Sequence, residues 1–282
     1  MSGSGRVLRC ADRTLDLSAP LVMGVLNVTP DSFSDGGRFL EPQRAVERGL
    51  RMAEEGAAII DVGGESTRPG AAPVTVAQEL DRVVPVIERL AARTPAVISV
   101  DTSQPEVMRA AAAAGAGLIN DVRGLRLPGA LAAAAGTSCA LCLMHMQGEP
   151  ATMQRHPQYV DVVSEVKTFL LARVQACHEA RIASERIAID PGFCFGKTAA
   201  HNLELLRRLP ELASSGLPVL VGVSRKSMVA ALTGRPVGGR LAGSIALAAL
   251  AVANGASIVR AHDVPETLDA VRVALAVSKG SE

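Results

Sequence analysis

Residues 96–121 read AVISVDTSQPEVMRAAAAAGAGLIND, and this stretch contains the pattern that decides the fold. Residues 96–100 form an aliphatic run without polar alternation, which is typical of a parallel strand covered on both faces. A helical segment is expected at 104–114, and a second aliphatic run follows at 117–119. The stretch therefore predicts a strand, a crossover helix and a second strand parallel to the first.

The same alternation repeats along the whole chain of 282 residues. Strand–helix units of this kind fill about the length that a (β/α)8 barrel needs, roughly 250 residues. We therefore predict an α/β fold, a (β/α)8 TIM barrel, as a single domain over residues 1–282. Residues 6–17 precede the first unit and are expected to form a β-hairpin that closes the bottom of the barrel. The predicted strands are 21–26, 58–62, 96–100, 117–119, 139–144, 186–189, 218–223 and 256–259.

Helix-capping patterns mark the starts of two of the predicted helices. Thr75 with Gln78 three positions later forms a capping-box pattern, and Ser103 with Glu106 forms the same pattern in the quoted stretch. In such a pair, each side chain binds a backbone N–H that would otherwise lack a partner. The helices are expected at 42–55, 76–92, 104–114, 126–135, 159–180, 198–208 and 240–253, with a last one beginning at Asp263.

The composition predicts a core built from small aliphatic side chains. Hydrophobic residues make up 48% of the chain, aromatic residues only 2%, and the net charge is +1. This combination excludes an intrinsically disordered chain. The 29 basic residues are balanced by 28 acidic ones, and aromatic platforms for bases are scarce. We therefore expect no nucleic-acid partner.

Neither a membrane span nor a secretion signal is evident. The N-terminus lacks a long apolar segment, and the most apolar stretch, residues 241–253, is shorter than a bilayer is thick. The five cysteines have scattered spacing, which suits a reducing compartment. Cys139 and Cys142 lie three apart on a predicted strand, so their thiols should point to opposite faces. We expect a cytoplasmic protein with no membrane partner.

Polar residues follow every predicted strand. In a barrel of parallel strands, all C-terminal ends lie on one face, where enzymes of this fold place their chemistry. A single Asp after a strand is usually a helix cap, but capping alone does not explain polar groups at all the strand ends. The convergence predicts an active site. These groups are Asn27, Asp61 with Gly63 and Gly64, Asp101, Asn120 and Asp121, His145, Asp190, Ser224 to Lys226, and Arg260 with His262.

The types of these residues indicate what the site could bind. A carboxylate can accept two parallel N–H bonds, so Asp101, Asn120 and Asp190 are suited to a flat heterocycle with adjacent N–H and C=O groups. Asp61 is assigned to orienting the loop that follows it, and Asp121 to a cap or a supporting role. The groups available for a phosphorylated moiety are Arg68, Lys226, Arg260 and His262.

Motifs of other enzyme classes are absent or incomplete. FGKT at 195–198 resembles the end of a P-loop, but Gly192 is one residue too close. Neither Ser66 nor Ser224 lies in a G-x-S-x-G nucleophile elbow, and no zinc signature is present. Hydrolase and zinc-enzyme functions are therefore disfavoured.

Eight motifs occur in a fixed order along the chain: GVLNVTPDSFSDGG (24–37), DVGGESTRPGA (61–71), SVDT (99–102), NDV (120–122), MHMQG (144–148), DPGFCFGKT (190–198), GVSRKS (222–227) and RAHDV (260–264). Together they resemble the dihydropteroate synthase family. The resemblance covers nearly the whole chain. It implies a TIM-barrel transferase of folate biosynthesis, a cytoplasmic homodimer and a target of sulfonamides. The family joins 6-hydroxymethyl-7,8-dihydropterin diphosphate to p-aminobenzoate and releases pyrophosphate.

The resemblance also implies where the pterin and its diphosphate bind. Arg260 would lie over the ring face and, with His262 and Asn27, meet the diphosphate. Asn27 would also be the ligand of Mg²⁺, which commonly takes few protein oxygens and completes its shell with phosphate and water. The pterin ring would be held by Asp101, Asn120, Asp190 and Lys226, with Met144 and Phe195 packed nearby.

The second substrate is assigned to the loops by the same resemblance. Ser66, Thr67 and Arg68 would close on the leaving group and the incoming amine. The resulting reaction is a substitution at the pterin methylene carbon, without a covalent enzyme intermediate. The p-aminobenzoate pocket would be formed by Phe33, Pro69, Lys226 and Ser227.

Two other functions stay open at this point. A pterin-binding barrel of the corrinoid-dependent methyltransferase type would need a cobalamin module or partner, and the chain has no D-x-H-x-x-G motif. An inactive paralogue that only binds pterin is the other alternative, although none of the signature residues is missing.

Overall fold

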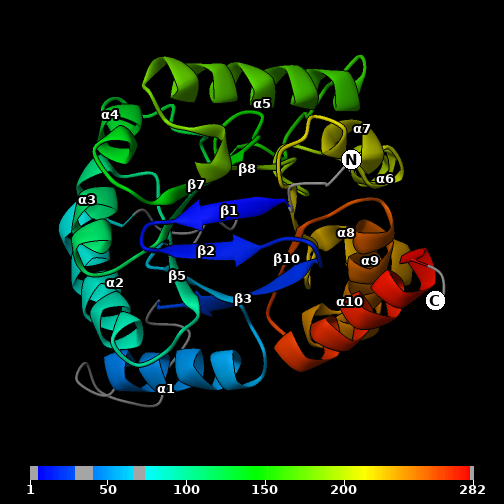
Figure 1. Ribbon diagram of the computed structural model, residues 1–282. Helices are drawn as coiled ribbons and strands as arrows, with labels where there is room; N and C mark the ends of the chain where they lie inside the picture. Colours follow the sequence, from blue (N-terminus) through cyan, green and yellow to red (C-terminus); the bar gives the residue numbers. More distant parts are fainter. Residues whose placement is uncertain (1–5, 29–40, 66–73, 151, 280–282) are drawn as a thin grey trace.

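The computed structural model of the protein describes residues 6–28, 41–65, 74–150 and 152–279. Eight parallel strands form one sheet in the order β8-β7-β6-β5-β4-β3-β10-β9, and a bridge between Ile189 and Val219 joins its two edges. Helices surround this nearly closed barrel (Figure 1). The predicted (β/α)8 fold is confirmed. The strands are β3 (Leu21–Asn27), β4 (Ile59–Gly63), β5 (Val97–Asp101), β6 (Leu118–Asp121), β7 (Ala140–Met144), β8 (Ile187–Asp190), β9 (Leu220–Gly222) and β10 (Ile258–Ala261).

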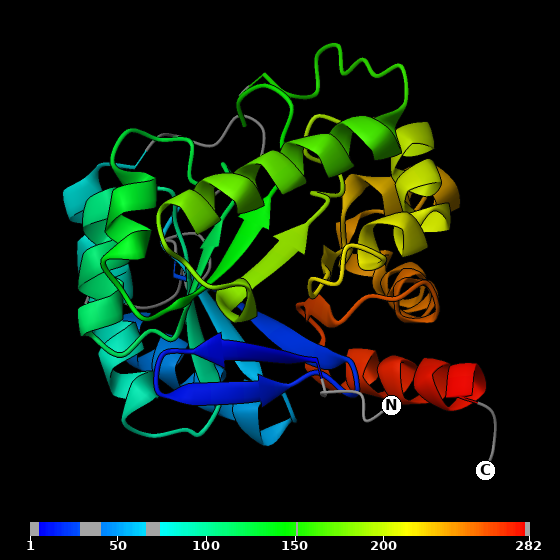
Figure 2. The same ribbon diagram turned by 45° about the horizontal axis from the view of Figure 1, so that its top comes forward.

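The predicted N-terminal hairpin is also confirmed. Strands β1 (Val7–Cys10) and β2 (Arg13–Asp16) pair antiparallel and lie across one end of the barrel (Figures 1 and 2). Leu8 and Cys10 of β1 are fully buried and pack on the inward side chains at the N-terminal ends of the strands. This apolar cluster fills the bottom of the barrel. Its buried members are Leu8, Cys10, Leu17, Met23, Ile59, Val97, Leu118, Ala140, Cys142, Ala188, Leu220 and Ile258.

Helices connect the strands, and a second, larger core lies between strands and helices. Cys139 belongs to this outer core and Cys142 to the barrel interior, so the two thiols do face opposite sides. The helices are α1 (Glu41–Glu54), α2 (Val76–Ala91), α3 (Pro105–Ala113), α4 (Ala130–Ala135), α5 (Val162–Glu179), α6 (Ala199–Arg207), α7 (Leu209–Ala213), α8 (Ser227–Thr233), α9 (Leu241–Ala253) and α10 (Val264–Lys279), with short 3-10 helices η2 (Ser184–Arg186) and η3 (Val237–Gly239).

The two predicted capping boxes have different outcomes. At α2, Thr75 and Gln78 bind each other's backbone N–H groups as expected. At α3 the prediction is wrong, because the helix starts after Gln104 without a side-chain cap. Ser103 instead donates its hydroxyl to the buried carboxylate of Asp121. A buried carboxylate needs hydrogen-bond donors, and this need outweighs the local capping pattern.

Helix α5 also differs from its prediction, since it starts at Val162 rather than at residue 159. Asp161 sets this start by accepting hydrogen bonds from the backbone N–H groups of Val163 and Ser164. The short helix α7 was not predicted, because it is too short to show a helical period. In the described ranges, the helices are all too short or too polar to cross a membrane.

Candidate active site

Arg260 lies at the centre of a charged network inside the C-terminal end of the barrel. Its Nε donates to Asp61 Oδ2 at 2.6 Å, and one terminal nitrogen donates to Asp101 Oδ2 at 2.9 Å. Asp61 Oδ2 also accepts from the amide of Asn120 at 3.0 Å. The network therefore joins side chains from β10, β4, β5 and β6.

The network is buried, and this decides its electrostatics. Burial raises the pKa of Asp101, and the positive charge of Arg260 acts against that rise. Burial disfavours the charged guanidinium of Arg260, but the charges of Asp61 and Asp101 more than compensate and raise its pKa. Arg260 is therefore a fixed cation. Asp101, by contrast, titrates close to neutral pH.

Asp61 has a larger role than the predicted one of orienting the following loop, because it holds two other side chains of this network. Its side chain is fully buried and binds both Asn120 and Arg260. Its second oxygen, Oδ1, has no partner among the described residues. The sequence does contain a signal for this role, because a charged residue inside an aliphatic strand needs a buried partner.

Asp190 and Lys226 form a second group of charges at the neighbouring strand ends. Asp190 Oδ1 accepts from the backbone N–H of Gly192 at 2.7 Å. Burial raises the pKa of Asp190, and the charge of Lys226 opposes this. Lys226 donates to the carbonyl of Phe193 at 2.7 Å, and its Nζ lies 4.7 Å from the ring centre of Phe195.

An apolar wall of methionine side chains lies next to these charges. Met144, at the end of β7, packs against Met146 and Met153 from the following loop. Val122 and the partly buried ring of Phe195 complete the cluster. Thioethers adapt to flat surfaces, so this wall is suited to one face of an aromatic heterocycle.

His262 and Asn27 lie on the same end of the barrel. The hydroxyl of Ser224 lies 3.0 Å from His262 Nδ1 and accepts from the His262 backbone N–H at 3.2 Å, which fixes the imidazole. Asn27 ends β3, opposite Gly63 of β4. A Cβ at Gly63 would lie 3.8 Å from Asn27 Oδ1 and 3.9 Å from Asp101 Oδ2. The glycine therefore keeps the space between these two oxygens free.

The structure brings together all the predicted site residues that it describes at this end of the barrel. Ser227, the first residue of α8, is exposed. Asp121 accepts from the backbone N–H groups of Arg123 and Leu125, so it caps the turn after β6, which is one of the two roles expected for it. Five predicted substrate-binding residues lie outside the described residues: Phe33, Ser66, Thr67, Arg68 and Pro69.

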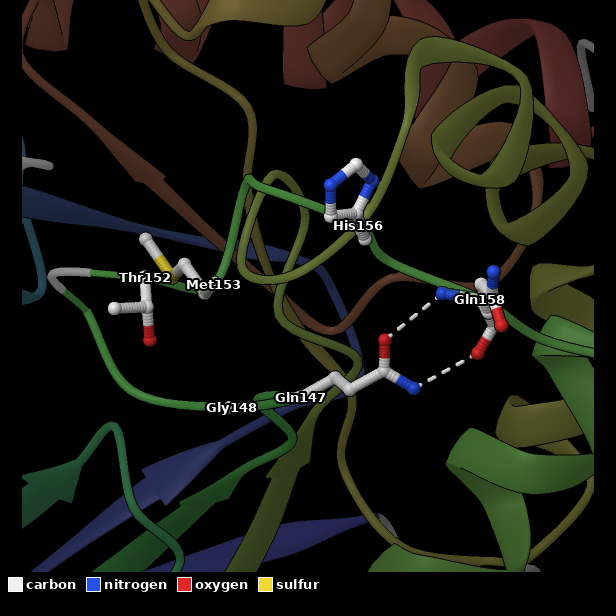
Figure 3. A pocket seen from close by; sticks show the side chains of 6 residues that line it. All are labelled: Gln147, Gly148, Thr152, Met153, His156 and Gln158. Carbon is white, nitrogen blue, oxygen red and sulfur yellow. Dashed lines mark hydrogen bonds between the residues drawn. The ribbon is translucent and has the colours of Figure 1, made fainter.

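The loop between β7 and α5 contains a further hollow of about 440 Å³, which shares Met153 with the apolar wall. Figure 3 shows its lining, in which the Gln147 amide makes two hydrogen bonds with the backbone of Gln158. The lining consists only of loop residues and carries none of the convergent charges, so this hollow does not have the chemistry of the central site. The residues are Gln147, Gly148, Thr152, Met153, His156 and Gln158.

Comparison with known proteins agrees with this geometry. A family model described as pterin binding enzyme matches residues 23–262. The chain is 54% identical over 269 residues to dihydropteroate synthase of Escherichia coli K12, covering 95% of each chain.

Solved structures show the same similarity. The enzyme of Xanthomonas albilineans with 4-aminobenzoic acid superimposes with a TM-score of 0.93 at 53% identity, over 99% of this chain and 100% of that one. The same enzyme with 7,8-dihydropteroate superimposes with a TM-score of 0.89 at 51% identity, over 98% of this chain and 100% of that one. The Yersinia pestis enzyme in a sulfonamide complex superimposes with a TM-score of 0.92 at 51% identity, over 97% of this chain and 100% of that one.

Proposed function

The chain belongs to the dihydropteroate synthase family of pterin-binding enzymes, and from this premise we propose where its substrates, metal and partner subunit bind. The enzyme is a transferase. It joins p-aminobenzoate to 6-hydroxymethyl-7,8-dihydropterin diphosphate and forms 7,8-dihydropteroate and pyrophosphate. We expect sulfonamides to compete with p-aminobenzoate for this site; the similar Yersinia pestis enzyme has been solved in complex with a sulfonamide drug.

The pterin ring binds inside the barrel mouth between the two groups of charges. Asp101 and Asn120 contact it from one side, and Asp190 and Lys226 from the other. Their carboxylate and amide groups match the N–H and C=O edges of the pterin, and Met144 with Phe195 covers its faces. The observation that carries this placement is Arg260, which is held between Asp61 and Asp101 directly beside Asn120.

Arg260 and His262 bind the diphosphate and stabilise the charge that develops as it leaves. The amine nitrogen of p-aminobenzoate attacks the pterin methylene carbon, the bond from this carbon to the diphosphate oxygen breaks, and the amine loses a proton. A cation fixed by two carboxylates needs little reorganisation during this step, which is the condition for effective electrostatic catalysis.

The second substrate lies nearer the exposed rim of the barrel. Ser227, with Lys226 beside it, forms the described part of the p-aminobenzoate pocket. We assign the other contacts to Phe33, Ser66, Thr67, Arg68 and Pro69.

The residues at the end of β3 fit Mg²⁺. Asn27 supplies a neutral oxygen, and Gly63 leaves the space in front of it free. Mg²⁺ prefers oxygen ligands and keeps several waters and phosphate oxygens, so one amide ligand suffices. When bound, the ion would neutralise charge on the diphosphate. Calorimetry of Mg²⁺ with pyrophosphate present should show weaker binding by Asn27→Ala.

A homodimer is the proposed assembly, formed through the face of α8, α9 and α10. These helices, with the short helix η3 between α8 and α9, expose several large aliphatic side chains: Leu232, Val237, Leu250, Val273 and Val277. Helices α9 and α10 pack side by side, so a second copy could bury both. Light scattering should give twice the chain mass, and Val273→Glu should yield monomers. All five cysteines are buried and free, which supports a reducing location, the cytoplasm.

The deciding experiment incubates the purified protein with pterin diphosphate, p-aminobenzoate and Mg²⁺. We expect equimolar dihydropteroate and pyrophosphate, and inhibition by a sulfonamide that more p-aminobenzoate overcomes. No product alongside normal pterin binding would overturn the proposed mechanism and identify an inactive paralogue.

A further inference from the structure

Lys197 is a buried cation that the reaction described above does not use. Only 3% of its surface is exposed. Its Nζ lies 2.9 Å from His145 Nδ1 and donates to the carbonyls of Gly192 and Phe195, each at 3.0 Å. The carbonyl of His145 lies farther away, at 3.5 Å. The three N–H groups of an ammonium thus match three close acceptors.

The ionisation of His145 supports this arrangement. Burial, with the charge of Lys197 adding to it, lowers the pKa of His145 to about 3. The imidazole is therefore neutral near pH 7, and its Nδ1 can accept the hydrogen bond from Lys197. Burial lowers the pKa of Lys197 to about 7, while the charge of Asp190 and the three acceptors around Nζ favour its protonated form.

The segment that Lys197 binds, residues 190–197, has an unusual backbone. Gly192, Cys194 and Gly196 have φ angles of 69°, 65° and 62°, which L-residues rarely adopt. A Cβ on Gly192 would collide with the carbonyl oxygen of His145, and one on Gly196 with that of Gln147. The segment is therefore pressed against the end of β7 in a conformation that needs support, most of all at the non-glycine Cys194.

This segment sets the position of half of the charged site. It begins with Asp190, contains the Phe193 carbonyl that accepts from Lys226, and carries the Phe195 ring. Hydrogen bonds from the loop between β7 and α5 hold its outer side, through Gln154 to the Cys194 carbonyl and Tyr159 to that of Gly196. Lys197 holds its inner side.

We infer that Lys197 is a positioning residue for pterin binding, which acts by fixing the turn 190–197 through the carbonyls of Gly192 and Phe195 and the imidazole of His145. The inference rests on the proposed function, because it assumes that Asp190, Phe195 and Lys226 contact the pterin. Lys197 itself touches no reacting atom. Its loss should weaken pterin binding more than it slows the chemical step.

The opposite end of the barrel offers a matched control. Arg186 also binds backbone carbonyls, those of Thr137 at 2.7 Å and Cys139 at 2.9 Å, and it also joins β7 to β8. It lies at the N-terminal ends of these strands, away from the site. Arg186→Met therefore removes a comparable cation–carbonyl clamp without touching the turn.

The experiment compares Lys197→Met, Lys197→Gln and Arg186→Met with the wild type. Calorimetry with 6-hydroxymethyl-7,8-dihydropterin diphosphate and Mg²⁺ measures affinity, steady-state kinetics separates KM from kcat, and thermal unfolding measures Tm. We expect Lys197→Met to raise Kd and the KM for pterin at least tenfold with a smaller change in kcat. Lys197→Gln, which keeps two donors, should lie between it and the wild type. Arg186→Met should lower Tm with a Kd within twofold of the wild type.

Equal Kd values for Lys197→Met and Arg186→Met at similar losses of Tm would overturn the inference, because Lys197 would then be structural only. If Lys197→Met does not fold, Lys197→Gln decides by the same comparison. Absence of product from the wild type would contradict the proposed function instead, so the two failures are distinguishable.

Discussion

The two ends of the barrel use the same strands for different purposes. At the N-terminal end, inward side chains such as Ile59, Val97 and Ile258 form an apolar cluster under the hairpin. Two residues further along β4 and β10, the inward positions hold Asp61 and Arg260. Side chains alternate across a strand, so residues two positions apart point to the same side. Moving two positions along these strands therefore leads from an apolar layer to a charged layer inside the barrel. The N-terminal end stabilises the barrel, and the C-terminal end binds substrate.

This difference predicts that changes at the two ends separate function from stability. The largest effect is expected for Asp190→Ala. Two charge-assisted hydrogen bonds to the ring would be lost, each contributing about 1.5–3 kcal/mol, so pterin affinity should fall roughly 1000-fold. Calorimetry with the pterin diphosphate measures this affinity. Asp161→Ala removes an exposed carboxylate that caps α5 and serves as the control. Near-wild-type affinity of Asp190→Ala would mean that the ring binds elsewhere.

At the other end, Leu8→Ala should change stability alone. Leu8 is fully buried between the hairpin and the barrel, and such a truncation typically costs about 2–5 kcal/mol. Urea unfolding should show this loss, while kcat/KM at a temperature where the variant is folded should stay within twofold of the wild type. A large fall in kcat/KM would show that the two ends are not independent.

Asp61→Asn tests the charge that holds Arg260. The amide nitrogen can occupy the place of the unpartnered Oδ1, so the two hydrogen bonds to the remaining oxygen are retained and only the charge is lost. Charge-assisted bonds are about twice as strong as neutral ones, which predicts a decrease in kcat/KM of roughly 10- to 30-fold. Unchanged kcat/KM would remove Asp61 from the functional network.

The smallest expected effect is a pH dependence of pterin binding. Burial raises the pKa of Asp101 to about 7, against the opposing charge of Arg260. Contact with the N–H groups of the ring needs the carboxylate, which is lost as pH falls through this value. The affinity for 6-hydroxymethyl-7,8-dihydropterin, which has no diphosphate to titrate, should therefore drop about tenfold from pH 8 to pH 6. Because burial also raises the pKa of Asp190, its titration acts in the same direction, whereas protonation of Lys197, whose pKa burial lowers to about 7, acts against both. An affinity that rises on acidification would contradict the proposed contacts.

The sequence predicts the barrel well because its signal is repeated. Each aliphatic run, such as 96–100, lies within about two residues of a strand, and polar residues after the runs do converge at one end. The features that local sequence patterns do not predict depend on contacts between residues that lie far apart in the chain. Ser103 does not cap α3 because Asp121 lies next to it in space, 18 positions away in the chain. The role of Lys197 is likewise invisible in the FGKT motif, since its partner His145 is 52 residues away.

Hydrogen exchange with and without the pterin diphosphate and Mg²⁺ tests most directly that substrate binds at the C-terminal end of the barrel. We expect slower exchange in peptides covering 118–125 and 190–198 and no change in the hairpin over residues 7–16. Protection of the hairpin, with unchanged exchange at 190–198, would contradict it.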